Sequence, residues 1–243
     1  MPLASKVKGH ELIDAVPRPQ KQERAAMREG IRKTIYDANG EKYTGEWQHD
    51  QRHGKGTSVD KKGNVYDGDW ARGVRHGYGV RSVVRNGEIQ KEYAGNWVNG
   101  KKDGYGTYFY NGGEMYDGEW YDGKRSGWGR MHYADGSVYE GGWLDGKRSG
   151  QGLLVLPNEN RYEGGWELGK KHGDGKFFYL DKGQLYIGTW VEDTAKCGEM
   201  IDLQREYAAE PTLYPIPELG LKDVSDVLAK ARADHLAAAA AAE

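Results

Sequence analysis

The sequence has a single cysteine, three phenylalanines and no long hydrophobic run among its 243 residues. One cysteine, Cys197, excludes an internal disulfide and is typical of a reducing compartment. No apolar stretch reaches the roughly 18 residues of a membrane-spanning helix. The N-terminal segment has neither a hydrophobic signal core nor a Met-Gly start for N-myristoylation. We therefore expect a cytoplasmic or cytoskeletal protein.

An excess of charge of one sign is also lacking. The 35 basic and 37 acidic residues leave a net charge of −2, which argues against a nucleic-acid-binding protein. Only 37% of the residues are hydrophobic, and large aliphatic side chains are scarce. Seventeen tyrosines and eight tryptophans must then supply much of the buried apolar area. This composition predicts a thin, distributed aromatic core.

The abundant residues recur in one fourteen-residue phrase, as in YDGEWYDGKRSGWG over residues 116–129. It places Tyr, Gly, Trp, Gly, Gly and Gly at relative positions 0, 2, 4, 7, 11 and 13. The first copy has Asp50 at one glycine position, and the last copy loses its three later glycines. Atypical terminal copies are expected of a stacked repeat array. Intervals of 23, 27, 23, 23, 23 and 24 residues separate the copies, which begin at Tyr43, Tyr66, Tyr93, Tyr116, Tyr139, Tyr162 and Tyr186.

Each copy predicts one β-hairpin. Tyr116, Gly118 and Trp120 alternate along the chain, so they share one face of a strand. Residues 127–133 predict a second strand, and residues 121–126 predict the turn between the two. Neighbouring hairpins would pair into an elongated single-layer antiparallel sheet, and about fourteen strands at ~4.8 Å each give a length of roughly 60–70 Å. The expected fold class is all-β, with a short C-terminal helix.

The repeated glycines predict sockets for the aromatic rings. Glycine weakens a strand unless another group must come close, so we expect the Tyr and Trp rings of adjacent hairpins to lie over bare backbone. These rings are then first of all the core of the array. If the sheet curls, part of its aromatic face would remain open as a groove for a partner. The candidate groove-lining residues are Tyr43, Trp47, Tyr66, Trp70, Tyr93, Trp97, Tyr116, Trp120, Tyr139, Trp143, Tyr162 and Trp166.

The phrase YxGxWxxGxxxGxG resembles the unit of the MORN-repeat family over about residues 31–199. The segment AKCGEMIDLQREYAAEPTLYPIPE, residues 195–218, is similar to the end of a short member of that family from ciliated organisms. The resemblance implies a non-catalytic structural and protein-interaction scaffold in the axoneme of cilia or flagella, at radial spokes or other microtubule-associated complexes. It also implies that axonemal proteins bind as an extended or helical peptide in the aromatic groove.

Two other function classes compete with the scaffold. The family's name refers to membranes, so the main alternative is a peripheral membrane or phosphoinositide-binding adaptor. The balanced charge of the array predicts weak membrane binding at most. An enzyme that uses the array as a handle would need a catalytic domain, and about 30 residues before the array and 45 after it are too few to form one.

Two further groups of residues are candidates for partner contacts. Trp128 lies between two glycines, and with Tyr78 and Tyr105 it would form a second aromatic patch on the face opposite the core; an ordinary exposed aromatic is the alternative. Basic pairs follow each Trp and would line one rim of the array, where an acidic protein tail or anionic headgroups would bind. Solubility and turn formation are the alternative explanation. The basic-rim residues are Lys101, Lys102, Lys124, Arg125, Lys147, Arg148, Lys170 and Lys171.

Motifs for catalysis and for cofactor binding are lacking. The sequence has no GxxxxGK[ST] phosphate loop, no GxSxG nucleophile elbow and no HExxH zinc pair. His53, His76 and His172 occupy the same repeat position, but other residue types interrupt the series, so we expect turn histidines that face water. We expect no catalytic residue, no cofactor and no metal ion.

The segments outside the array have their own predicted structures. Residues 19–32 would form a short helix, and a proline-containing segment after the array would be extended, a form that docks well on aromatic surfaces. A monomer and a homodimer both remain open. The expected parts are a polar N-terminal segment (1–30), the array (31–199), the extended linker (200–220) and the C-terminal helix (221–243).

Overall fold

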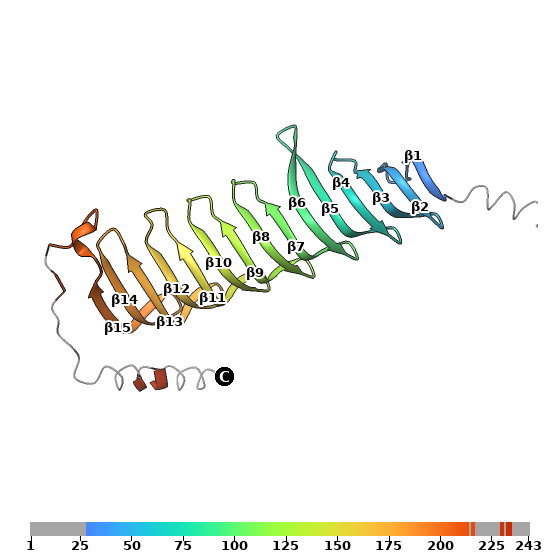
Figure 1. Ribbon diagram of the computed structural model, residues 1–243. Helices are drawn as coiled ribbons and strands as arrows, with labels where there is room; N and C mark the ends of the chain where they lie inside the picture. Colours follow the sequence, from blue (N-terminus) through green and yellow to red (C-terminus); the bar gives the residue numbers. More distant parts are fainter. Residues whose placement is uncertain (1–27, 214, 217–228, 231, 235–243) are drawn as a thin grey trace, which may run out of the picture.

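The computed structural model describes residues 28–213, 215–216, 229–230 and 232–234. In this part of the chain, fifteen strands form one antiparallel sheet in which each strand pairs only with its neighbours in sequence (Figure 1). The sheet is a long ribbon, and the β-hairpins stack along it in the order of the chain. The predicted all-β fold of stacked hairpins in a single layer is confirmed.

The strand bounds follow the repeat. Even-numbered strands carry the Tyr-x-Gly-x-Trp part of the phrase, and odd-numbered strands from β3 to β13 carry the last two glycines. The strands are β1 (Gly30–Tyr36), β2 (Lys42–Gln48), β3 (Gln51–Val59), β4 (Val65–Ala71), β5 (Val74–Arg85), β6 (Glu88–Val98), β7 (Lys101–Phe109), β8 (Met115–Tyr121), β9 (Lys124–His132), β10 (Val138–Leu144), β11 (Lys147–Val155), β12 (Arg161–Glu167), β13 (Lys170–Tyr179), β14 (Gln184–Val191) and β15 (Thr194–Asp202).

The turn inside each hairpin explains the first glycine after the Trp. Between β8 and β9, Asp122 has φ 48° and Gly123 has φ 86°. Two successive positive φ values are typical of the two-residue type I′ turn, whose twist suits an antiparallel hairpin. Glycine adopts this conformation without a steric penalty. In the first copy Asp50 takes the glycine's place with φ 60°, so the turn keeps its form with a residue type that tolerates it.

One hairpin is longer than the others, which accounts for the 27-residue interval between two copies. Strands β5 and β6 have 12 and 11 residues, and their connecting turn at Asn86 and Gly87 has positive φ at both residues. The tip of this hairpin rises above the neighbouring ones in Figure 1. The insertion therefore extends the edge of the ribbon and leaves the pairing of the repeats intact.

Strand β1 is a half-repeat that was not predicted from the sequence. Gly30 lies opposite Trp47 in the pairing of β1 with β2, as Gly54 lies opposite Trp70 in the pairing of β3 with β4. The helix predicted over residues 19–32 is therefore wrong for Gly30 to Arg32, because the free edge of β2 offers them strand pairing. Residues 19–27 lie outside the described residues.

The chain after β15 is only partly described. A 3₁₀ turn spans Arg205–Tyr207, and residues 208–213 have no regular secondary structure. Of the helix expected over residues 221–243, residues 229–230 and 232–234 are helical, and the others lie outside the described residues. We call the described helical residues the C-terminal helical segment.

Candidate functional site

One face of the sheet carries a continuous ladder of Tyr and Trp rings. The Tyr116 ring centroid lies 5.2 Å from that of Trp120 in its own repeat and 5.2 Å from that of Trp143 in the next, with interplanar angles of 90° and 81°. The same edge-to-face alternation runs from Trp47 to Tyr186. Each such pair contributes about 0.5–1.5 kcal/mol beyond the buried area. Ring contacts therefore join every repeat to the next.

The polar atoms of the ladder are bonded to the backbone. The Tyr116 hydroxyl donates to the carbonyl oxygen of Glu119 at 2.9 Å, and Trp120 Nε1 donates to the carbonyl oxygen of Gly106 in the preceding repeat at 2.9 Å. Burial also raises the pKa of the tyrosines, to about 12 for Tyr43. The first Trp, Trp47, has a buried Nε1 without a hydrogen-bond partner in the described part of the chain. The five indoles from Trp70 to Trp166 thus each bond to the repeat before them.

Pairs of glycines form the sockets under the rings. Gly118 lies opposite Gly129 in the pairing of β8 with β9. A Cβ on Gly118 would lie 2.4 Å from Gly129 Cα, and a Cβ on Gly129 would lie 2.3 Å from the Tyr116 hydroxyl oxygen. Trp143 from the next hairpin donates to the Gly129 carbonyl oxygen at 3.1 Å. The socket therefore holds the Tyr of its own hairpin and the Trp of the following one.

The basic pairs of the predicted rim point in two different directions. Lys124 Nζ lies 2.9 Å from Asp145 Oδ1 in the next turn, whereas Arg125 lies over the Trp143 ring, with Cζ 4.3 Å from the centroid. Arg125 is opposite Trp120 in the hairpin, and opposite residues share a face. The predicted rim thus divides into an outer cation row (Lys101, Lys124, Lys147, Lys170) and an inner cation row (Lys102, Arg125, Arg148, Lys171).

The inner cation row continues toward the N-terminus as a cover over the ladder. Arg52 and Arg75 lie 5.1 Å and 4.4 Å from the ring centroids of Trp70 and Trp97. Arg28 lies 4.3 Å from the Trp47 centroid, which completes the half-repeat at β1. Cations over aromatic faces are attracted by the ring quadrupole. These side chains shield the ladder from water on the exposed side of a single-layer sheet.

Lys102, in the inner cation row, lies among aromatic rings. Its Nζ lies 4.1 Å from the Trp120 centroid and 4.3 Å from the Tyr108 centroid. Burial lowers the pKa of Lys102 to about 8. The amine therefore changes charge in the folded protein well below the pH at which it does so in the unfolded chain.

We expect the free energy of unfolding of the wild type to rise from about pH 8 to about pH 10 relative to that of Lys102→Arg. A group with a lowered folded-state pKa binds fewer protons in the folded than in the unfolded chain, so stability increases with pH between the two pKa values. Arginine stays charged throughout, and Arg125 shows that it fits this position. Urea unfolding of both proteins near pH 7.5 and pH 9.5 measures the difference, and a difference that is independent of pH contradicts the expectation.

The twelve candidate groove-lining rings are covered by the chain itself. Their exposed fractions range from 0% for Tyr93 and Tyr116 to 7% for Trp47 and Trp70. The inner cation row and partly buried rings such as Tyr110 pack over them. The structure thus places these residues in the core, and contact of a partner peptide with them stays a prediction.

The face opposite the ladder, here called the second face, carries the three residues of the predicted aromatic patch. Tyr78, Tyr105 and Trp128 are 55%, 54% and 54% exposed. The Tyr105 hydroxyl donates to Asp117 Oδ2 at 2.5 Å. Half-exposed rings in one repeat position form a row along the ribbon, and their contact with a partner stays a prediction.

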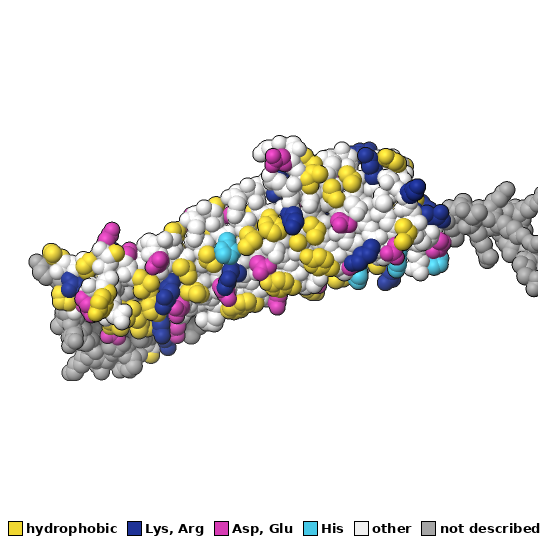
Figure 2. Space-filling model, turned by 45° about the horizontal axis from the view of Figure 1, so that its top comes forward, with side chains coloured by type: hydrophobic (Ala, Val, Ile, Leu, Met, Phe, Trp, Pro, Cys, Tyr) yellow, Lys and Arg dark blue, Asp and Glu magenta, His cyan; other side chains and the backbone are white. Residues whose placement is uncertain are grey.

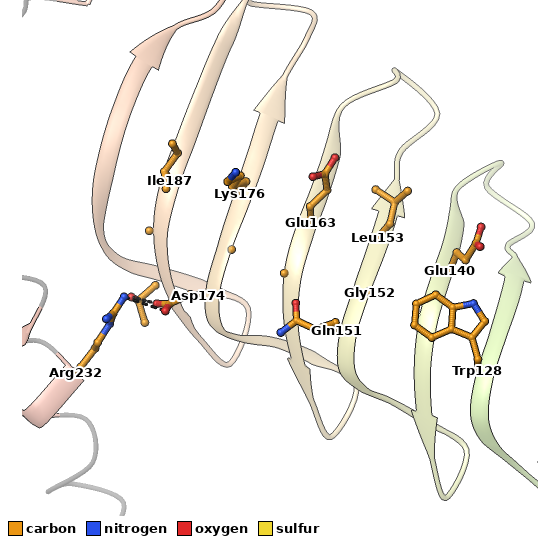
Figure 3. A pocket seen from close by; sticks show the side chains of 14 residues that line it. Trp128, Glu140, Gln151, Gly152, Leu153, Glu163, Asp174, Lys176, Ile187 and Arg232 are labelled. Carbon is orange, nitrogen blue, oxygen red and sulfur yellow. Dashed lines mark hydrogen bonds and ion pairs between the residues drawn. The ribbon is translucent and has the colours of Figure 1, made fainter.

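A trough with a volume of about 800 Å³ lies on the second face next to Trp128 (Figure 3). Its floor is bare backbone, and apolar side chains, Leu153 and Ile187, line it together with charged residues. This feature was not predicted from the sequence. A signal was present, since Gly142 and Gly165 stand where the four repeats before them have Glu, Asp or Asn.

The described part of the chain has neither a metal-ligand group nor a membrane-spanning helix. Among its His, Cys, Asp and Glu residues, no three are grouped so that they could hold a metal ion. None of its helices is long and apolar enough to cross a membrane. Of the repeat histidines, His172 lies 3.3 Å from the Glu167 carboxylate.

Comparison with known proteins gives consistent matches along the array. The family model "MORN repeat" matches residues 43–65, 66–82, 93–115, 116–138, 139–161 and 162–183. The MORN repeat-containing protein 3 of Xenopus laevis is 55% identical over 210 residues, which cover 85% of this chain and 88% of that protein. The Homo sapiens protein of the same name is 55% identical over 58 residues, 24% of each chain. A solved structure titled "Streptogramin B lyase structure" has a TM-score of 0.17 and 11% identity over 74% of this chain and 71% of that one, which supports no comparison of folds.

Proposed function

The chain belongs to the MORN-repeat family, and we propose that it is a non-catalytic scaffold that binds other proteins in the axoneme of cilia or flagella. Within the axoneme we propose radial spokes or other microtubule-associated complexes as its place. Its partners would be other axonemal proteins, bound as an extended or helical segment or through acidic tails.

The observation that carries the scaffold function is that the repeated residues build the core, whereas variable residues are exposed on the surface. The repeated Tyr, Trp and Gly residues are used in the ladder and its sockets. Among the positions that vary between copies, that of Tyr78, Tyr105 and Trp128 lies on the second face and is exposed. An elongated repeat array that presents variable side chains along its length is suited to bind extended partners.

The axonemal location is supported by the C-terminal part of the chain. Residues 195–218, which are similar to the end of a short ciliary member of the family, include most of β15 and the 3₁₀ turn that follows it. Residues 195–207 of this segment thus lie at the end of the array, where a protein-specific surface would lie.

Proximity labelling in a ciliated cell tests this proposal. The full chain fused to a biotin ligase should label axonemal proteins and should stay with the axoneme after detergent extraction. The ligase alone is the control for labelling by diffusion. A fusion that is fully extracted by detergent and labels the same proteins as the control contradicts the axonemal role.

The membrane alternative finds little support in the arrangement of charge. Basic and acidic side chains alternate over the face seen in Figure 2, without a continuous basic patch. Lys101, Lys124 and Lys170 of the outer cation row each pair with an acidic residue of the next turn. The inner cation row lies over aromatic rings. Few cations of the two rows thus remain for lipid headgroups.

We therefore expect weak binding to anionic liposomes that is lost near about 150 mM salt. Each basic residue near an anionic surface contributes only about 1 kcal/mol, and salt screens this attraction within a short distance. Cosedimentation with phosphatidylserine and phosphoinositide vesicles at low and physiological salt measures it. Tight, salt-resistant binding to phosphoinositide vesicles would favour the membrane adaptor over the scaffold.

A further inference from the structure

Beside the trough, two neighbouring repeats lack a side chain that earlier repeats have. Gly142 pairs with Trp128 and Gly165 pairs with Gln151, and both partners line the trough. In the fourth repeat, Glu119 lies on the second face and accepts a hydrogen bond from the backbone N–H of Trp128 at 3.1 Å. The fifth and sixth repeats have Gly142 and Gly165 at this position, so their backbone is uncovered there. The side chains at this position in the first four repeats are Glu46, Asp69, Asn96 and Glu119.

The residues that line the trough are suited to contact another segment of protein. Trp128 stands at one end and is 54% exposed, and Ile187 is 40% exposed. Gly152, Gly164 and Gly175 contribute bare backbone to the floor, which lets another chain approach closely. Exposed apolar side chains grouped around a hollow usually mark a surface that binds another segment.

A segment of the same chain already reaches the other end of the trough. Arg232 of the C-terminal helical segment donates to Asp174 Oδ2 at 2.9 Å, across 58 residues of sequence (Figure 3). The other oxygen of this carboxylate, Oδ1, accepts from Thr189 Oγ1 at 2.9 Å, so Asp174 is held in place for the guanidinium. Arg232 is itself among the residues that line the trough.

Ile216, the last described residue before the C-terminal helical segment, is bonded to the array. The backbone N–H of Ile216 donates to Asp202 Oδ2 at 2.9 Å, which holds the chain at the end of β15. From there the C-terminal helical segment lies back under the last strands of the ribbon in Figure 1. The chain that leads to the C-terminal helical segment is therefore held at β15, beside the strands that line the trough.

We propose that the trough is the docking site of the chain's own C-terminal helical segment, with the ion pair between Arg232 and Asp174 as its anchor. Both side chains are more than half exposed, and an exposed ion pair is weak. The docking is therefore reversible, and a docked segment keeps other proteins out of this part of the second face. The inference does not depend on the axonemal role.

Cysteine cross-linking in the full chain tests the docking. In a Cys197→Ser background, Lys176→Cys in the trough is combined with Lys230→Cys in the helical segment and treated with a bismaleimide of about 10 Å span. The matched control combines Lys230→Cys with Thr57→Cys, which has the same repeat position far along the array. We expect an intramolecular cross-link for the first pair, at least tenfold faster than for the control and independent of protein concentration.

Charge reversal tests the anchor. Adding Asp174→Arg should slow cross-linking of the trough pair about two- to fivefold, the range expected for the loss of an exposed ion pair. Adding Arg232→Asp as well should restore the rate. Equal rates for the trough and control pairs overturn the docking, and insensitivity to both reversals overturns the anchor. Cross-linked dimers without intramolecular product would mean that the segment docks on a second copy, which also overturns the proposal.

Discussion

Replacing Trp120 with alanine should lower the free energy of unfolding by about 3–5 kcal/mol, as expected for a buried aromatic side chain. The ring is 5% exposed and contacts Tyr93 of the preceding repeat as well as Tyr116 of its own. Its removal also leaves the carbonyl oxygen of Gly106 without the indole donor, and an unsatisfied buried group adds to the loss. The effect should extend to both neighbouring hairpins, because each repeat is stabilised by its neighbours.

Trp128→Ala is the matched control for this prediction. Trp128 is in the same hairpin but is 54% exposed on the second face. We expect its replacement to lower the free energy of unfolding by less than about 1 kcal/mol, as for most surface changes. Urea unfolding of the two variants and the wild type measures both effects. A large loss for Trp128→Ala, or a small one for Trp120→Ala, would contradict the assignment of core and second face.

Replacing Gly118 with alanine should lower the free energy of unfolding by about 3 kcal/mol, near the upper end for an overpacked site. The added Cβ would lie 2.4 Å from Gly129 Cα and 2.7 Å from the carbonyl oxygen of Trp128. Both contacts are with backbone, so relief requires the two strands to separate. The same change would displace the Tyr116 hydroxyl, which lies 2.7 Å from the new atom.

Gly112→Ala is the matched control, because a Cβ at Gly112 would have no neighbour within 4 Å. This turn glycine should tolerate the change within about 0.5 kcal/mol. Thermal melts of the two variants distinguish a socket from a general sensitivity of the glycine-rich chain. Equal melting temperatures for both would mean that the glycine pairs are not sockets.

The hairpins and the position of the core could be predicted from the sequence because both depend on local spacing. Tyr116, Gly118 and Trp120 alternate, and alternation in a strand fixes the face. The Asp-Gly pair at Asp122 and Gly123 fixes the turn. These patterns lie within one copy of the phrase. The other copies support the same prediction independently.

The division of the basic pairs was missed, although the turn contains the information. A two-residue turn at Asp122 and Gly123 places Arg125 opposite Trp120 and Lys124 opposite Tyr121. The second residue of each pair must then share the Trp face. Both residues of a pair follow the same turn in sequence, so sequence position alone does not separate them.

The half-repeat and the trough escaped prediction for a different reason. Strand β1 has neither the Tyr nor the Trp of the phrase and is recognised only by its pairing with β2. Beside the trough, Gly142 and Gly165 lack the side chain that earlier copies have, in copies that otherwise fit the pattern. Its contact with Arg232 joins residues 58 positions apart, which no local spacing predicts.

Small-angle X-ray scattering of the full chain in solution tests most directly the claim that the aromatic ladder builds one long, thin sheet. Fifteen strands at ~4.8 Å spacing give about 70 Å for the array alone. We predict a skewed distance distribution that peaks at short distances and extends to at least that length. A compact protein of this size has a radius of gyration of about 18 Å. A symmetric distribution that ends near the ~45 Å diameter of such a sphere would contradict the account.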